Sequence, residues 1–116
     1  MIEYEYFHLN SDNRKNGKYL DILHPEFEEF GQSGKVFKKE DFIEVDLDSN
    51  EYEILNFNEV QLSNNSYLCK YILVNKSSGM ASNRSSIWVL YKDEWKLIFH
   101  QGTKVSIWND IINKKQ

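Results

Sequence analysis

The sequence predicts an α+β fold in which one strongly curved antiparallel sheet carries helices on one face. Helical spacing is confined to the N-terminal part of the chain, where Tyr19, Leu20 and Leu23 recur on one side of residues 11–24. From residue 51 onward the sequence is strand-like, with apolar runs separated by short polar turns. A curved sheet half covered by helices leaves an apolar hollow at its open end, so the fold class also predicts a ligand cavity.

Two helices are expected before Pro25. Residues 2–9 form a short helix in this interpretation, although their aromatic side chains would suit a strand almost as well. The second helix covers residues 11–24, with Ser11 or Asp12 available as N-cap. It should end near the residue before Pro25, because a residue that precedes proline disfavours helical backbone.

The remaining elements follow from turn residues and alternation. A short strand is expected at 27–30, then a turn between Gly31 and Gly34, then a short helix within 38–47. Residues 76–83 look like a flexible connection, being rich in serine and asparagine. Long strands are predicted at 51–62, with a bend at Asn56–Asn58, at 66–75, and in the hairpin of 84–103.

Length and charge bound the class of protein. The chain of 116 residues fits a single domain over 1–116, and its net charge of -4 disfavours nucleic-acid binding, which needs a basic surface. No stretch approaches the ~20 apolar residues of a membrane span, and the N-terminus lacks the pattern of a signal peptide. The single cysteine, Cys69, permits no internal disulfide and is expected to be a small core residue. We therefore expect a soluble cytoplasmic protein.

Known cofactor and catalytic motifs are missing from the sequence. It contains no GxGxxG, GxxxxGK[ST], HExxH or GxSxG pattern, so no cofactor is predicted. The three histidines, His8, His24 and His100, are too far apart in sequence to indicate a local metal clamp. No metal site is predicted.

The hairpin RSSIWVLYKDEWKLIFHQGT carries polar residues at one end and apolar residues at the other. If Asp93-Glu94 is its two-residue loop, alternation places nine side chains on one face. Its apolar members, including Trp88 and Phe99, lie toward the loop, and four polar residues gather at the far end: Arg84, Ser86, Gln101 and Thr103. A guanidinium beside aromatic rings suits a ligand that has a carboxylate or a carbonyl group.

Two alternatives stay open in this hairpin. Arg84 faces a ligand, or it pairs internally with Glu29, which alternation places on the same face as Phe27, and a paired arginine could still direct a remaining donor to a ligand. His100 falls on the opposite face, where it would be a core or interface residue. A register slip or a bulge near Gly102 would bring His100 to the ligand face as a proton acceptor.

Three sequence blocks resemble a known family. They are HPEF with EFG and SG within 24–34, RSSIW at 84–88, and a closing Trp-x-x-x-x-His-Gln-Gly-Thr at 95–103. Together they are similar to an uncharacterised bacterial subgroup of the nuclear transport factor 2-like superfamily, in its SnoaL-like and ketosteroid-isomerase-like group. The resemblance covers roughly residues 9 to 104. It implies a cystatin-like cone, often homodimeric through the sheet, and its pattern maps onto Glu29, Arg84, Ser86, Trp88, His100, Gln101 and Thr103.

The resemblance does not settle an activity, because one fold hosts many functions. The aspartate base and oxyanion-hole tyrosine of ketosteroid isomerases and the Asp–His dyad of related dehydratases have no matching motif here. The leading hypothesis is a pocket for a small molecule, bound by Arg84, Ser86, Trp88, Phe99, Gln101 and Thr103, with Glu29 or His100 as base if the protein is an isomerase or lyase. The alternative is a non-catalytic homodimeric interaction module that uses the sheet face with Ile87, Val89, Ile98 and His100.

Overall fold

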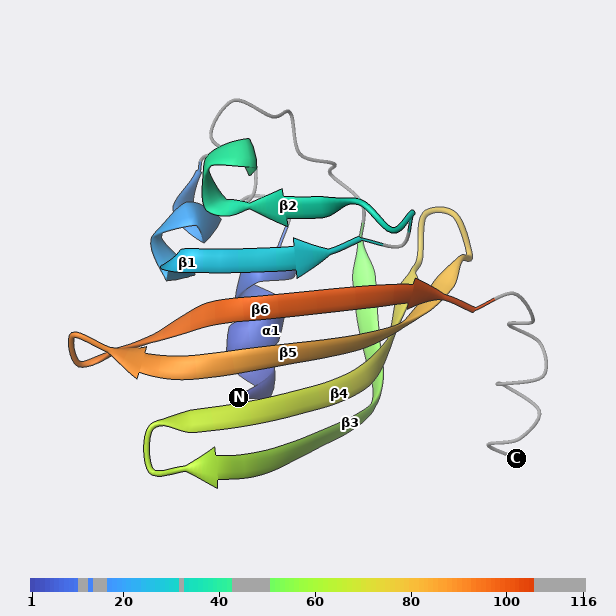
Figure 1. The fold of residues 1–116 in the computed structure, drawn as a ribbon. Helices are drawn as coiled ribbons and strands as arrows, with labels where there is room; N and C mark the ends of the chain where they lie inside the picture. The colour runs from blue at the N-terminus through green and yellow to red at the C-terminus, as the bar shows by residue number, and fades with distance from the viewer. Residues whose placement is uncertain (11–12, 14–16, 32, 43–50, 106–116) are drawn as a thin grey trace.

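The computed structural model describes residues 1–10, 13, 17–31, 33–42 and 51–105. It confirms the α+β class, with one N-terminal helix and a curved, unclosed sheet of six strands in the order β2-β1-β6-β5-β4-β3 (Figure 1). Its elements in chain order are α1 (Ile2–Leu9), η1 (Lys18–Ile22), β1 (Leu23–Phe30), β2 (Val36–Lys38), η2 (Lys39–Phe42), β3 (Tyr52–Ser63), β4 (Ser66–Asn75), β5 (Ala81–Tyr91) and β6 (Glu94–Lys104). No helix in the described part of the chain has the length and apolar character needed to cross a bilayer.

The predicted helix over 11–24 differs from the structure in its second half. Within the described residues of this range Asn13 is helical, but η1 spans Lys18–Ile22 and β1 already begins at Leu23, ahead of Pro25. Proline favours extended backbone in the residue before it, and β1 pairs there with β6. The proposed N-caps, Ser11 and Asp12, lie outside the described residues.

Several other boundaries also differ from prediction. A helix was expected within 38–47. Its described residues form a short 3-10 turn, η2, and residues 43–47 are not among the residues that the structure describes. The connection expected at 76–83 ends earlier, because β5 starts at Ala81. The helix at 2–9, the strand at 66–75 and the bend near Asn56 are confirmed; Asn56 has a φ of 56° where the register of β3 shifts against β4.

Five pairings join the six strands, and four of them are antiparallel. β3 to β6 pair antiparallel in sequence order, whereas β1 runs parallel to β6 and brings Glu29 opposite His100. A purely antiparallel sheet was expected, and the parallel contact is the difference. Chain direction explains it, since β1 reaches the sheet edge after the helical segment rather than through a hairpin.

Helix α1 lies against one face of the sheet, which we call the inner face (Figure 1). This face carries Tyr71, Ser86, Trp88 and His100, and it buries Glu5 and His8 of α1. The opposite, outer face carries the intervening residues of the same strands. Burial of the inner face creates the larger core cluster, whose buried members are Tyr19, Leu23, Phe27, Cys69, Trp88 and Leu97.

Candidate functional site

The register of the β5–β6 hairpin decides which side chains can meet. Its turn is Lys92-Asp93, not the predicted Asp93-Glu94, and both turn residues have positive φ, 50° and 65°, as a tight type I′ turn requires. Moving the turn by one residue shifts each cross-strand partner by two positions. Because side chains alternate with a period of two, the residues near the turn keep the faces that were predicted for them. Trp88 still shares a face with Leu97, its partner across the strands.

A bulge then reverses the faces beyond the turn. Trp88 pairs with Leu97 but Ile87 pairs with Phe99, which leaves Ile98 as the extra residue of β6. From there on His100 shares the inner face with Arg84, Ser86 and Trp88, although it was predicted on the opposite face. The predicted inner placement of three residues is wrong for the same reason: Phe99, Gln101 and Thr103 lie on the outer face.

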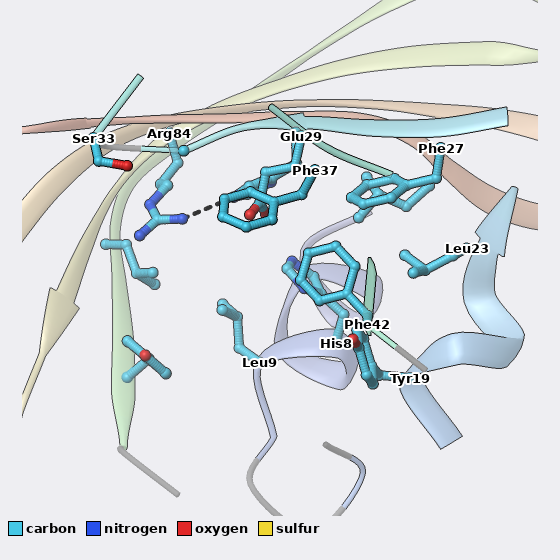
Figure 2. A pocket seen from close by; sticks show the side chains of 15 residues that line it. His8, Leu9, Tyr19, Leu23, Phe27, Glu29, Ser33, Phe37, Phe42 and Arg84 are labelled. Atoms are coloured by element: carbon cyan, nitrogen blue, oxygen red, sulfur yellow. Dashed lines mark hydrogen bonds between the residues drawn. The ribbon is translucent and has the colours of Figure 1, made fainter. Parts of the chain in front are cut away.

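His100, which the bulge brings inward, and Arg84 both border a cavity of about 400 Å³ on the inner face. One part of its wall is aromatic and aliphatic, with rings of Phe27, Phe37 and Phe42 directed toward a common space (Figure 2). The other part is polar and includes four groups that can bear charge: His8, Glu29, Arg84 and His100. The volume lies in the range of small-molecule sites.

Arg84 is held in the cavity wall by two side-chain contacts. Its Nε donates to Ser82 Oγ at 2.7 Å, and its Nη1 lies 3.0 Å from His100 Nε2. Among the described residues, the hydrogen bonds of the guanidinium go to Ser82 and His100, and the predicted partner Glu29 lies opposite His100 on the neighbouring strand. A guanidinium has five N–H groups, and three of these find no acceptor in the described part of the chain.

Behind the cavity wall lies a buried carboxylate that is not among the residues predicted from the sequence. Glu5 of α1 is completely buried and accepts hydrogen bonds from Tyr71 Oη at 2.7 Å, Ser86 Oγ at 3.2 Å and Trp88 Nε1 at 2.7 Å. His8 Nε2 lies 3.2 Å from the same carboxylate. Three donors and an imidazole thus compensate for the lost hydration of one buried charge.

The electrostatics of Glu5 follow from these contacts. Burial by itself raises the pKa of the carboxyl group, but the hydrogen bond and the charge of His8, the charge of His100 and the indole of Trp88 together lower it to about 2. Burial, reinforced by the charge of Glu5, raises the pKa of Tyr71 well above its usual 10. Tyr71 therefore stays a neutral donor while Glu5 stays an ionised acceptor.

Ser86 and His100 connect Glu5 to the cavity. Ser86 Oγ lies 2.8 Å from His100 Nδ1 and donates to Glu5, and both Ser86 and His100 are buried. Neither Ser86 nor Trp88 lines the cavity, so their predicted contact with a ligand does not follow from their positions. Their contacts are to Glu5 instead. Arg84, His100 and Glu29 are the predicted site residues that border the cavity.

Glu5, His8 and His100 also satisfy a distance condition for metal binding. Their potential ligand atoms all lie within 4.8 Å of one another. However, the guanidinium of Arg84 approaches His100 Nε2, and Glu5 Oε1 already receives Tyr71 and Ser86. A metal ion would have to displace a cation and compete with these donors. We therefore describe the cluster as a hydrogen-bond network.

The sequence contains a partial indication of the buried cluster around Glu5. Glu5, His8 and Leu9 are the buried residues of α1, and they follow the i, i+3, i+4 spacing of one helix face. A carboxylate on such a face needs buried donors, and Trp88, Tyr71 and Ser86 are candidates by residue type. Nothing local in the sequence assigns these donors to Glu5, which is separated from Trp88 by 83 positions.

Comparisons with known proteins agree on the fold. No protein-family model matches the sequence, and no curated protein matches it. Among solved structures, it is similar to an NTF2-like protein from Cytophaga hutchinsonii, with a TM-score of 0.72 and 16% identity over 90% of this chain and 94% of that one. It is also similar to a protein from Parabacteroides distasonis described provisionally as a ketosteroid isomerase, with a TM-score of 0.75 and 14% identity over 90% and 85% of the two chains.

A third similar structure is the association domain of the C. elegans protein CaMKII. Its TM-score is 0.65 at 13% identity, with 88% of this chain and 91% of that chain covered. A further neighbour, from Nostoc punctiforme, is described as having a cystatin-like fold. At these identities the likeness concerns the fold alone, and it confirms the nuclear transport factor 2-like, cystatin-like architecture that the sequence blocks imply.

Proposed function

We propose that this protein binds a small molecule that has an apolar, ring-sized body and an anionic or carbonyl head group. The carrying observation is the division of the cavity wall: aromatic rings at one part, and Arg84 with His100 at the other. Apolar burial supplies the affinity, and the guanidinium supplies the orientation. The three N–H groups of Arg84 without an acceptor among the described residues are the ones offered to the head group.

Proton transfer is the chemistry that this wall supports best. His100 and Glu29 are opposite each other on β6 and β1 and both border the cavity. A neutral imidazole in a cavity wall that is partly shielded from water can accept a proton from a bound ligand. The nearby guanidinium stabilises the negative charge that then develops on the ligand. If the protein is catalytic, we propose isomerisation or elimination with His100 or Glu29 as base. The neighbour described provisionally as a ketosteroid isomerase supports this reaction class.

Ligand binding is tested by thermal shift and calorimetry with a matched series of probes. Benzoate, cyclohexanecarboxylate and acetate share the head group and differ in their apolar body, whereas cyclohexanone and benzyl alcohol keep the body without the charge. We expect the larger carboxylates to stabilise the wild type and Arg84→Gln to lose at least tenfold in affinity for them. Thr103→Ala, on the outer face, is the control. Equal stabilisation of wild type and Arg84→Gln by every probe would refute the proposal.

A second candidate function is supported by the outer face of the sheet. Val60, Leu68, Ile87 and Phe99 are successive register partners across β3, β4, β5 and β6, and so they form one apolar row. Phe30 extends the row, with its ring edge-on to Phe99 at 5.1 Å between centroids. We propose that a second copy of this chain covers the row in a homodimer. The likeness to an association domain supports assembly through this fold.

The dimer proposal keeps part of the sequence prediction and changes the rest. Ile87 belongs to the row as expected, whereas His100 lies on the inner face and cannot contribute. Light scattering after size exclusion is the test, with Ile87→Asp expected to give monomers and Asn58→Asp, on a polar part of the sheet, expected to leave the dimer intact. A wild type that remains monomeric at ~100 μM would overturn this candidate.

A further inference from the structure

We infer that Glu5, acting through Ser86, holds neutral His100 in the tautomer with its proton on Nδ1, so that Nε2 is the atom that accepts a proton when an anionic ligand engages Arg84. This inference rests on the proposed ligand site. It assigns Glu5 and Ser86 as positioning residues, since neither lines the cavity.

The direction of each hydrogen bond follows from what each group can do. Guanidinium nitrogens only donate, so the contact of 3.0 Å between Arg84 Nη1 and His100 Nε2 requires an unprotonated Nε2. A neutral imidazole then carries its proton on Nδ1 and donates it to Ser86 Oγ, 2.8 Å away. The hydroxyl has one proton of its own, which goes to Glu5 Oε1 at 3.2 Å.

The opposite tautomer of His100 is disfavoured by its contact with Arg84. If Ser86 donated to Nδ1, the neutral ring would carry its proton on Nε2. Two N–H donors, from Arg84 and His100, would then face each other at 3.0 Å in a site where His100 is only 1% exposed. Glu5 would lose the Ser86 donor as well. The first arrangement satisfies every one of these groups, and the second leaves two of them opposed.

The charges around His100 determine when it accepts a proton. In the described part of the chain, the titratable and charged groups placed against it include Glu5 and His8 from α1, Glu29 from β1 and Arg84 from β5, while Tyr71 of β4 acts through Glu5. Glu5 favours the imidazolium, and the Arg84 guanidinium opposes it and also occupies Nε2. An anionic head group that binds Arg84 offsets its charge and draws it from Nε2. Ligand binding and proton uptake by His100 are therefore coupled.

The tautomer can be measured on the ligand-free protein. In uniformly ¹⁵N-labelled full-length chain, long-range ¹H–¹⁵N spectra distinguish protonated from unprotonated ring nitrogens. His100→Gln identifies the signals of His100 among those of the three histidines. We expect the Nδ1–H form to dominate at pH values where the ring is neutral, and Ser86→Ala to abolish that preference. A dominant Nε2–H form in the wild type would overturn the inference, whatever the variants do.

The role of Glu5 is tested by titrating His100 in Glu5→Gln, which keeps the shape of the side chain. We expect its titration midpoint to fall by about 1–3 pH units, the size of effect that an opposite charge exerts at ~4–6 Å. Glu3→Gln, on the exposed side of the same helix, is the matched control and should leave the midpoint unchanged. If His100 titrates with the same midpoint in Glu5→Gln and in the wild type, Glu5 does not act on His100, and its positioning role is wrong.

The coupling is tested with benzoate as the probe. Calorimetry at the His100 midpoint, in two buffers of different ionisation enthalpy, should reveal proton uptake on binding to the wild type and its absence in His100→Gln. Binding without proton uptake would overturn the coupling. If benzoate and its homologues do not bind, the proposed function is refuted, and the tautomer of the ligand-free protein still decides the positioning role of Glu5 and Ser86.

Discussion

The guanidinium of Arg84 lies directly over the backbone of Gly102, its partner on β6. A Cβ atom placed on Gly102 would be 2.9 Å from both Cζ and Nε of Arg84 and 3.0 Å from Nη1. These separations are shorter than side-chain contacts allow, and Arg84 is also held by Ser82 and His100. Gly102 thus keeps open the space in which the guanidinium contacts His100, which gives the HQGT block a physical reason for its glycine.

Gly102→Ala is expected to move the guanidinium of Arg84 away from His100 Nε2. The backbone of Gly102 is not in the left-handed region, so the substitution acts through the new methyl group rather than through strain. We expect carboxylate affinity to fall about tenfold with a change in stability of about 1–3 kcal/mol, typical of overpacking. Calorimetry and urea unfolding measure the two effects. Thr103→Ala, on the other face, should change neither.

Trp88→Phe should destabilise the protein because it removes a donor from a buried charge. The indole Nε1 donates to Glu5 Oε2 at 2.7 Å, and Trp88 is fully buried. A hydrogen bond to a charged group contributes about 1.5–3 kcal/mol, and the smaller ring adds a cavity cost. Urea unfolding should show a loss of at least 2 kcal/mol. Trp95→Phe, at a half-buried position, is the comparison, and an equal loss there would contradict the assigned role of the indole.

Stability is expected to fall in acid through Glu5. Its folded-state pKa of about 2 lies below the ordinary value of 4.5. The carboxylate therefore contributes stability that is fully present above pH ~4.5 and is lost as the pH falls toward ~2, a contribution on the order of 3 kcal/mol. Unfolding free energies measured from pH 6 to pH 2 should show this slope in the wild type and a weaker one in Glu5→Gln. Parallel profiles would mean that Glu5 titrates as it does in the unfolded chain.

Cys69 should be chemically silent in the folded protein. Burial, followed by the negative charge of Glu5, raises the pKa of the thiol to about 12, and the side chain is completely buried. Since the thiolate is the reactive form, we expect native protein to react with Ellman's reagent at least a hundredfold more slowly than unfolded protein. Labelling kinetics with and without urea test this. Fast native labelling would contradict both the burial and the core role that the sequence predicts for this residue.

Much of the site was predictable from residue types, and its geometry was not. Arg84, Glu29 and His100 were named from the sequence, and all three border the cavity. Phe99 and Gln101 were named by the same reasoning and lie on the other face. A single unpaired residue in β6, Ile98, separates the two outcomes, because one inserted residue inverts every later side chain of a strand.

By itself, the sequence determined the α+β class, the strand over 66–75 and the burial of Cys69, since periodicity and composition act locally along the chain. The tertiary structure alone decided that β1 pairs parallel to β6, that His100 faces inward, and that Glu5 meets donors from β4 and β5. These outcomes depend on strand register and on contacts across more than 60 positions of sequence. Such contacts are selected by the joint burial of many side chains, and no local pattern of residues encodes them.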